Sequence, residues 1–111
     1  MCQKMYDRSI KYNDNRISLM AGQNGKCGVT GNQLYVHAMH CHHKIPLELG
    51  GTDDYGNLIW LEENVHRLIH ATDQSIIDKY LAILKLSKAA LKKVNSLRES
   101  AGNSKIVEVA A

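Results

Sequence analysis

The stretch CHHKIPLELGGTDDYGNLIWLEENVHRLIH, residues 41–70, decides the fold of this chain. It opens with a His doublet and passes through a glycine-containing loop to the short apolar run NLIWL, which predicts a buried strand. From Glu62 onward the apolar residues recur at helical spacing, and two acidic residues stand where a helix N-terminus favours negative charge. The stretch therefore predicts the second strand of a hairpin followed by a helix.

His66 and His70 are four residues apart on this expected helix, so both imidazoles project from one face and can bind one cation. The spacing alone is weak evidence, because core and surface His pairs share it. A metalloprotease helix needs Glu directly after the first His, and Arg67 stands there, which argues against that class.

The His42-His43 doublet strengthens the metal-site interpretation. Adjacent strand residues point to opposite faces, so both can serve one site only near a strand end. Pro46 lacks a backbone N–H and suits the position just beyond such an end. One His of the doublet can then hold a metal while the other acts as a base; two partly exposed loop histidines remain the alternative.

Outward from this stretch, the pattern predicts further elements on both sides. A short helical pattern is expected within residues 14–24, broken by Gly22 and Gly25, then a glycine-rich turn, then a strand from Leu34 to His43 that forms the hairpin. Helices are expected from Asp73 and from Ser87, the second ending near Gly102. The tail, residues 103–111, is too weakly patterned to assign and is a candidate for disorder.

Length and composition fit one domain, residues 1–111, of the α+β class. The 44% hydrophobic fraction excludes a wholly disordered chain. Three cysteines cannot all pair, and the sequence shows no secretory signal and no membrane-length apolar run. We therefore expect a soluble, cytoplasmic protein with no membrane partner.

The net charge of +3 is unevenly distributed. Residues 27–78 hold two basic residues against seven acidic ones and contain all six His. Residues 79–98 hold six basic residues and no acidic one, and residues 1–26 are also basic. Basic flanks suggest a polyanionic partner, although Lys on a helix surface often only solvates it.

The order and spacing of these elements resemble the HNH endonuclease motif, which runs His-His-x-x-Pro, a Gly-Gly loop, Asn-Leu, then His-x-x-x-His. More narrowly, NDNRISLMAGQNGKCGVTG, MHCHHKIPLELGGTDDYGNL, VHRLIHAT and LKKVNSLRESAGN resemble the endonuclease domain at the C-terminus of group II intron reverse transcriptase/maturase proteins. This resemblance covers about residues 12–103 and points to a mobile element.

The resemblance implies a ββα-metal finger, with a short N-terminal helix and additional C-terminal helices over residues 73–102. It makes His43 the general base and Asn57 the residue that ties the interstrand loop together. It makes His42, His66 and His70 ligands of one divalent metal ion. His37 and His40 match no motif position and are expected to be ordinary strand or turn residues.

The chemistry explains these residue types. Cleaving an anionic phosphodiester needs a base for water and a cation for the charge at phosphorus. A neutral imidazole near pH 7 can take the proton. We therefore expect in-line attack by water that leaves 3′-hydroxyl and 5′-phosphate ends. Three imidazoles favour Zn²⁺, Ni²⁺ or Mn²⁺, while the resemblance allows Mg²⁺ or Mn²⁺ for turnover.

The sequence departs from many HNH proteins at the positions of a structural zinc ribbon. Cys27 is followed by Thr30 where a second Cys would stand, and Glu62 and Val65 occupy the positions of the other pair. No ribbon zinc is expected, and Cys27 and Cys41 are interpreted as small core residues.

The partner is expected to be DNA, bound mostly through its backbone with low sequence specificity. The candidate contacts are Arg67, Lys85, Lys88, Lys92 and Lys93. In an intron protein, intron RNA and the reverse transcriptase portion would be further partners. The alternative function is a zinc-stabilised DNA-binding module without cleavage activity.

Overall fold

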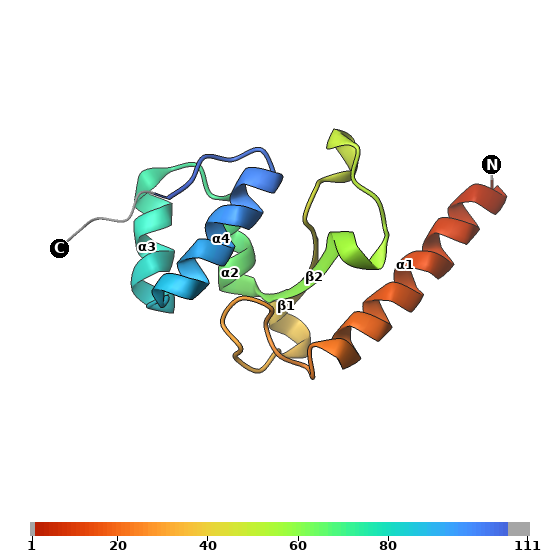
Figure 1. Ribbon diagram of the computed structural model, residues 1–111, viewed down its shortest axis with the longest axis horizontal. Coiled ribbons are helices and arrows are strands. Elements are labelled where there is room, and N and C mark those ends of the chain that lie inside the picture. Colours follow the sequence, from red (N-terminus) through yellow and green to blue (C-terminus); the bar gives the residue numbers. More distant parts are fainter. Residues whose placement is uncertain (1, 107–111) are drawn as a thin grey trace.

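The computed structural model describes residues 2–106 and, for residues 2–9, the backbone alone. Short 3-10 turns separate the longer elements, and Figure 1 shows a small hairpin between a long helix on one side and three helices on the other. The longer elements are α1 (Cys2–Gly22), β1 (Met39–His43), β2 (Leu58–Glu62), α2 (Glu63–His70), α3 (Gln74–Leu84) and α4 (Lys88–Ser100). The α+β class is confirmed.

The predicted hairpin is present, but its first strand is shorter than expected. β1 and β2 pair antiparallel, with His42 opposite Ile59 and His43 opposite Leu58. The expectation that the strand begins at Leu34 is wrong, because Val36–Ala38 forms a 3-10 turn before β1. Tyr35 and Val36 are 67% and 76% exposed, so no buried face holds this part of the chain in a sheet.

The N-terminal helix is much longer than the sequence pattern indicates. α1 spans 21 residues, where a short helix within residues 14–24 was expected. Tertiary contacts hold its C-terminal end: the indole of Trp60 donates to the carbonyl of Arg16, and the side chain of Gln23, just beyond the helix, bonds both the N–H and the carbonyl of Trp60. The break expected at Gly22 is confirmed.

The last two helices, α3 and α4, begin where their capping residues predict. Asp73 accepts from the N–H of Ser75 at the start of α3, and Ser87 accepts from the N–H of Ala90 at the start of α4. Gly102 adopts a φ of +89° just beyond α4, as expected of a glycine that follows a helix C-terminus.

The core lies between the hairpin, α2 and α4. Its fully buried side chains are Leu58, Leu61, Val65, Leu68, Ile69 and Val94. The first part of the tail packs against it, since Ile106 is buried and exchanges hydrogen bonds with the Asn95 side chain. The candidate disorder of the tail therefore does not apply to residues 103–106, and residues 107–111 lie outside the described residues. No helix in the described part of the chain is long and apolar enough to cross a membrane.

Candidate functional site

Three histidines converge at the junction of the hairpin and α2. His42 comes from β1, and His66 and His70 come from successive turns of α2. One ring nitrogen of each lies within 4.8 Å of those of the other two, and we call these residues the histidine cluster. Within residues 10–106 this is the one group of three or more ligating side chains close enough to hold a metal ion. The fold thus brings together the three residues that the sequence predicted as ligands.

The histidine cluster is electrostatically prepared to bind a cation. Burial, followed by the charges of His66 and His70, lowers the pKa of His42 to about 3. Burial and the neighbouring His70 lower the pKa of His66 to about 4, and burial also lowers the pKa of His70. All three rings are therefore neutral at pH 7, with lone pairs free for a metal. Nε2 of His42 is fully buried and has no hydrogen-bond partner among the described residues, so this nitrogen has a lone pair or an N–H that the protein leaves unused.

Arg98 supports the helix that carries two of these histidines. It is 3% exposed, and its Nη1 donates to the carbonyls of Leu68 and Ala71 at 2.7 Å. Its Nε donates to the carbonyl of Ser104 at 2.7 Å. The guanidinium thus binds carbonyls left without partners at the C-terminal end of α2, where positive charge is favourable.

This role of Arg98 corrects one sequence-based interpretation. Arg98 was grouped with the basic residues of a DNA-binding surface, yet it is buried in the fold. The sequence does contain a pattern that indicates the burial of Arg98. Arg98 follows Val94 by four residues and Leu91 by seven, which places it on the apolar face of α4.

His43 lies beside the histidine cluster but points to a different partner. Its Nε2 is 2.8 Å from Oδ1 of Asp53, and its ring stacks on Tyr12 with centroids 5.6 Å apart. Asp53 is 6% exposed. Sequence reasoning missed both partners: Asp53 and Asp54 are adjacent carboxylates in one loop, and only the folded loop turns the first inward and the second to solvent.

Asn57 joins the two ends of the loop between the strands. Its Oδ1 accepts from the N–H of Ile45 at 2.9 Å, and its Nδ2 donates to the carbonyls of Ile45 and Thr52 at 3.0 and 2.8 Å. The loop also needs Gly51, because a Cβ there would lie 1.8 Å from the carbonyl oxygen of Ile45. The side chain of Asn57 therefore joins the two ends of the loop that follows His43.

A cavity of about 430 Å³ joins these groups. Its lining is more polar than apolar and includes His42, His43, His66, His70, Glu48 and Asn103. The loop residues Pro46 and Leu47 form one side, and the C-terminal end of α4 forms the other. The histidine cluster and His43 thus open into one space.

The other two histidines lie outside the histidine cluster. His40 stacks on His66 with ring centroids 4.5 Å apart, and its Nε2 is 4.0 Å from a carboxylate oxygen of Glu63. His37 is exposed in the turn before β1. His40 therefore contacts a candidate ligand without joining the group.

The positions compared with a zinc ribbon are tied together without sulfur ligands. Thr30 donates to the Glu62 carboxylate at 2.5 Å, while Cys27 and Val65 are buried in the core. Cys27 and Cys41 are free thiols, and burial raises the pKa of Cys41. A raised pKa disfavours the thiolate, which is the metal-binding form.

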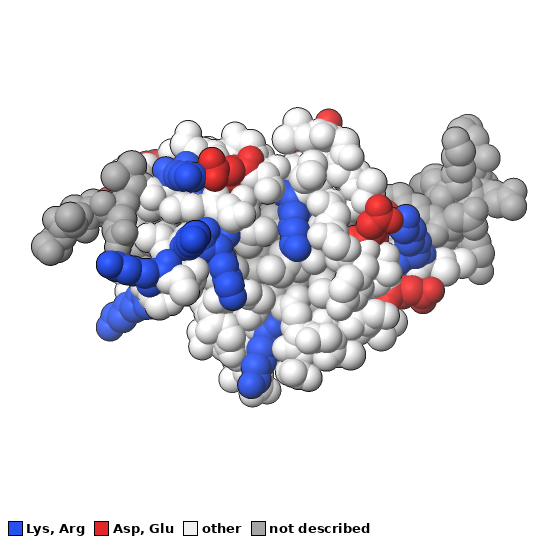
Figure 2. Space-filling view, viewed as in Figure 1, with Lys and Arg blue, Asp and Glu red and all other residues white. Residues whose placement is uncertain are grey.

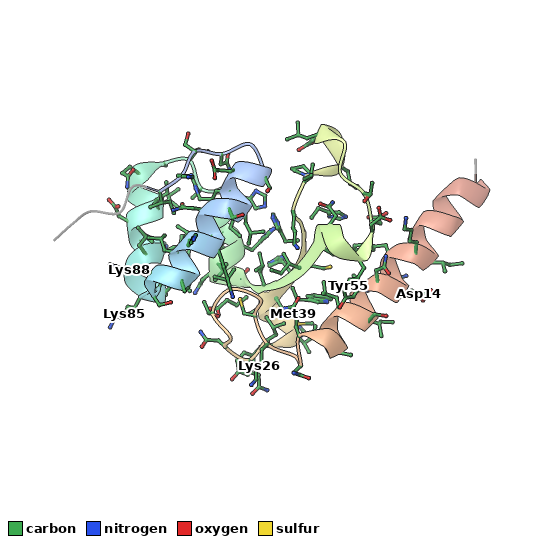
Figure 3. The ribbon with its side chains drawn as sticks, in the orientation of Figure 1. Asp14, Lys26, Met39, Tyr55, Lys85 and Lys88 are labelled. Atoms are coloured by element: carbon green, nitrogen blue, oxygen red, sulfur yellow. The ribbon has the colours of Figure 1, made fainter. Side chains whose placement is uncertain are left out.

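Basic side chains gather over α3 and α4 in Figure 2, and Figure 3 shows Lys85 and Lys88 at the turn between these helices, on the side away from the hairpin. Lys92 and Lys93 are exposed on α4. Arg67 is also exposed, but it pairs with Glu63 at 3.0 Å and does not line the cavity. The four Lys residues are therefore accessible, and neither they nor Arg67 line the cavity that holds the histidines.

Comparison with known proteins finds a similarity to one family in the middle of the chain. Residues 25–72 match the family model of the HNH endonucleases. Neither a curated protein nor a solved structure matches the chain. The matched segment contains β1, β2 and α2, and with them the histidine cluster, His43 and Asn57. This segment is therefore similar to HNH endonucleases, a family whose name denotes nuclease activity.

Proposed function

We propose that this protein is a metal-dependent DNA endonuclease that hydrolyses phosphodiester bonds to leave 3′-hydroxyl and 5′-phosphate ends. The observation that supports the proposal is that one cavity contains two kinds of histidine. Three neutral histidines converge within 4.8 Å of one another, while a fourth, His43, is held apart from them by a carboxylate. A nuclease needs both groups, because a histidine that ligates a cation has no lone pair left to accept a proton.

His42, His66 and His70 would hold the divalent cation, and the site fits one. The buried Nε2 of His42 lacks a partner, and the depressed pKa values keep the rings in the ligating form at pH 7. Imidazole ligands suit Zn²⁺, Ni²⁺ and Mn²⁺ better than Mg²⁺, so we propose that Zn²⁺ or Ni²⁺ can be bound and that Mn²⁺ or Mg²⁺ supports turnover. When bound, the cation neutralises charge on the phosphoryl group as it develops.

His43 would act as the general base. As a water molecule attacks the phosphorus, His43 takes its proton, the bond from phosphorus to the 3′-oxygen breaks, and that oxygen gains a proton from solvent. Asn57 would hold the loop that follows His43, through its bonds to Ile45 and Thr52, and so keep the base in place. Together, the β1-β2 hairpin and α2 would constitute a ββα-metal finger.

The proposed substrate is DNA, gripped through its backbone. The exposed Lys85, Lys88, Lys92 and Lys93 offer contacts to phosphates, with Arg67 as a further candidate, and no base-reading helix is evident in the described chain. Low intrinsic sequence specificity follows. The resemblance over residues 12–103 supports a place within a group II intron protein, where intron RNA and a reverse transcriptase portion would supply the target.

Nicking of supercoiled plasmid tests the proposal. Wild-type protein is incubated with Mg²⁺, Mn²⁺ or Zn²⁺, beside His43→Ala and His66→Ala, and the product ends are tested by ligation and by primer extension. We expect nicking in wild type and a loss of about 10² to 10⁴-fold in His43→Ala. His43→Ala should still bind metal, whereas His66→Ala should bind it weakly.

The same experiment weighs the alternative function. A zinc-stabilised module that only binds DNA would retain the metal and the DNA affinity but would nick under no metal. Nicking that survives unchanged in His43→Ala would refute the assignment of the base and leave the nuclease in place.

A further inference from the structure

The ring of His43 is held by two residues that lie outside the paired strands. Asp53, from the loop between β1 and β2, places Oδ1 at 2.8 Å from Nε2, and Tyr12, from α1, stacks on the ring with an angle of 9° between the planes. We propose that Asp53 and Tyr12 are positioning residues that fix the tautomer and the orientation of His43. The inference rests on the proposed function, in which His43 is the general base.

The contact with Asp53 decides which nitrogen can accept a proton. A carboxylate only accepts hydrogen bonds, so Nε2 of His43 carries the hydrogen and donates it. In a neutral imidazole the lone pair then resides on Nδ1. Nδ1 makes no hydrogen bond to any described residue, and His43 lines the cavity that holds the histidine cluster. The carboxylate thus keeps the basic nitrogen available to a water in that cavity.

Tyr12 restricts the remaining freedom of the ring. A hydrogen bond at Nε2 leaves the imidazole able to tilt about that bond, and a near-parallel aromatic ring on one face limits the tilt. The side chain of His43 retains 20% exposure, so it is accessible without being loosely held. The imidazole of His43 is thereby held in one tautomer and in one orientation of its plane.

Asp53 is itself placed by α1. Nδ2 of Asn15 donates to the Asp53 carbonyl at 2.7 Å, and Lys11 pairs with the neighbouring Asp54 at 2.5 Å. α1 ends at Gly22, before the segment that matches the HNH family begins. The helix that flanks the domain on one side in Figure 1 is therefore part of the machinery that orients the base.

Histidine-ring NMR of the ¹⁵N-labelled protein tests the tautomer directly. Long-range correlations distinguish protonated from unprotonated ring nitrogens, and in wild type at pH 7.5 we expect His43 as the Nε2-protonated form. Asp53→Ala should show a mixture of tautomers. Asp78→Ala, which removes an exposed carboxylate on α3, is the control and should leave the His43 signals in place. A mixture in wild type, or an unchanged form in Asp53→Ala, overturns the inference.

Nicking kinetics test the consequence. We expect Asp53→Ala to lower kcat by about 10 to 100-fold, less than loss of the base itself, with KM for DNA within about twofold. Asp53→Asn keeps an acceptor oxygen of the same size and should recover part of the rate, and it replaces Asp53→Ala should that variant fail to fold. Tyr12→Ala should lower kcat by a smaller factor than Asp53→Ala, and Tyr12→Phe should recover most of that loss because it keeps the stacked ring.

The two measurements separate this inference from the proposed nuclease. A wild-type protein that nicks no DNA, yet whose His43 tautomer changes in Asp53→Ala, supports the positioning contact and refutes the nuclease. An Asp53→Ala protein that nicks at the wild-type rate refutes the positioning role and leaves the nuclease intact.

Discussion

The two walls of the cavity are stabilised by different interactions, one by apolar packing and the other by hydrogen bonds. The cluster wall, His42, His66 and His70, is mounted on β1 and α2, and the inner residues of α2, Val65, Leu68 and Ile69, are completely buried. The loop wall consists of His43 and the start of the segment between the strands. Most residues of that segment are exposed, and it is held by Asp53, which contacts His43, and by the hydrogen bonds of the Asn57 side chain.

The difference matches what the proposed function requires of each wall. The proposed ligands must stay neutral and convergent, which attachment to a packed hairpin and helix provides. The proposed base must be accessible to water and must keep one orientation. The partial exposure of the loop provides the first, and the hydrogen bond and the stacked ring provide the second. Damage to the packing should therefore appear in stability and metal affinity, whereas damage to the loop should appear mainly in turnover.

The largest effect is expected where the cluster wall depends on a buried charge. Arg98→Ala leaves the carbonyls of Leu68 and Ala71 without their donor in the interior and should lower the free energy of unfolding by about 4 kcal/mol in urea denaturation. Arg67→Ala is the control, because Arg67 is exposed and its pair with Glu63 is worth less than about 1 kcal/mol. Equal losses in the two variants would contradict the capping role of Arg98.

Removal of one ligand should weaken metal binding without unfolding the protein. His70→Ala should lower the affinity for Zn²⁺ or Ni²⁺ by about 100-fold or more, measured by competition with a chromogenic chelator, because one of three converging nitrogens is lost. His37→Ala removes an exposed histidine outside the histidine cluster and should bind as wild type. Similar losses in both variants would mean that metal binds the histidines nonspecifically.

The metal-free protein should lose stability on mild acidification. The folded pKa values of about 3 for His42 and about 4 for His66 lie below the unfolded value near 6.5, so the unfolded chain binds more protons as the pH falls through this range. This stability is complete above about pH 6.5 and is lost below it. After allowance for the partial exposure of His66, we expect a loss on the order of 2 kcal/mol between pH 7 and 5.

Urea denaturation in the presence of a chelator at several pH values checks this loss. The range from pH 7 to 5 lies above that in which most carboxylates titrate. His42→Leu should give a flatter dependence, and a wild-type stability that does not change over this range would refute the burial of neutral histidines.

A change at the loop wall should lower the nicking rate rather than the metal affinity. Asn57→Ala removes three hydrogen bonds at a half-buried position and should cost about 1 to 2 kcal/mol of stability. Nicking should fall while the affinity for Zn²⁺ stays near the wild-type value, because Asn57 does not contact the histidine cluster. A parallel fall in metal affinity would show that the two walls are not independent.

The smallest effect is expected far from both walls. Lys92→Ala should weaken DNA binding by a few-fold and reduce the slope of log affinity against log salt by about 1, as expected for one phosphate contact. Fluorescence anisotropy with a duplex oligonucleotide at several salt concentrations measures both values. An unchanged slope would place the DNA path elsewhere on the molecule.

The sequence pattern predicted the hairpin, the three later helices and the shared helix face of His66 and His70, while the resemblance implied that His42 joins them. The pattern-based features follow from local signals: apolar periodicity, the capping residues Asp73 and Ser87, and a four-residue His spacing. The start of β1 and the length of α1 were predicted wrongly, because Tyr35 and Val36 resemble strand residues without a face to bury, and α1 is stabilised by contacts to Trp60 rather than by its own pattern.

By itself, then, the sequence determined most of the elements and the shared face of His66 and His70, because spacing along a helix or strand fixes which side chains share a face. Only the tertiary structure decided that Asp53 rather than Asp54 meets His43, that Tyr12 covers its ring, and that Arg98 turns inward to α2. These contacts join residues 10 to 31 positions apart across loops. No local periodicity encodes such a contact, since it depends on how the separate elements pack.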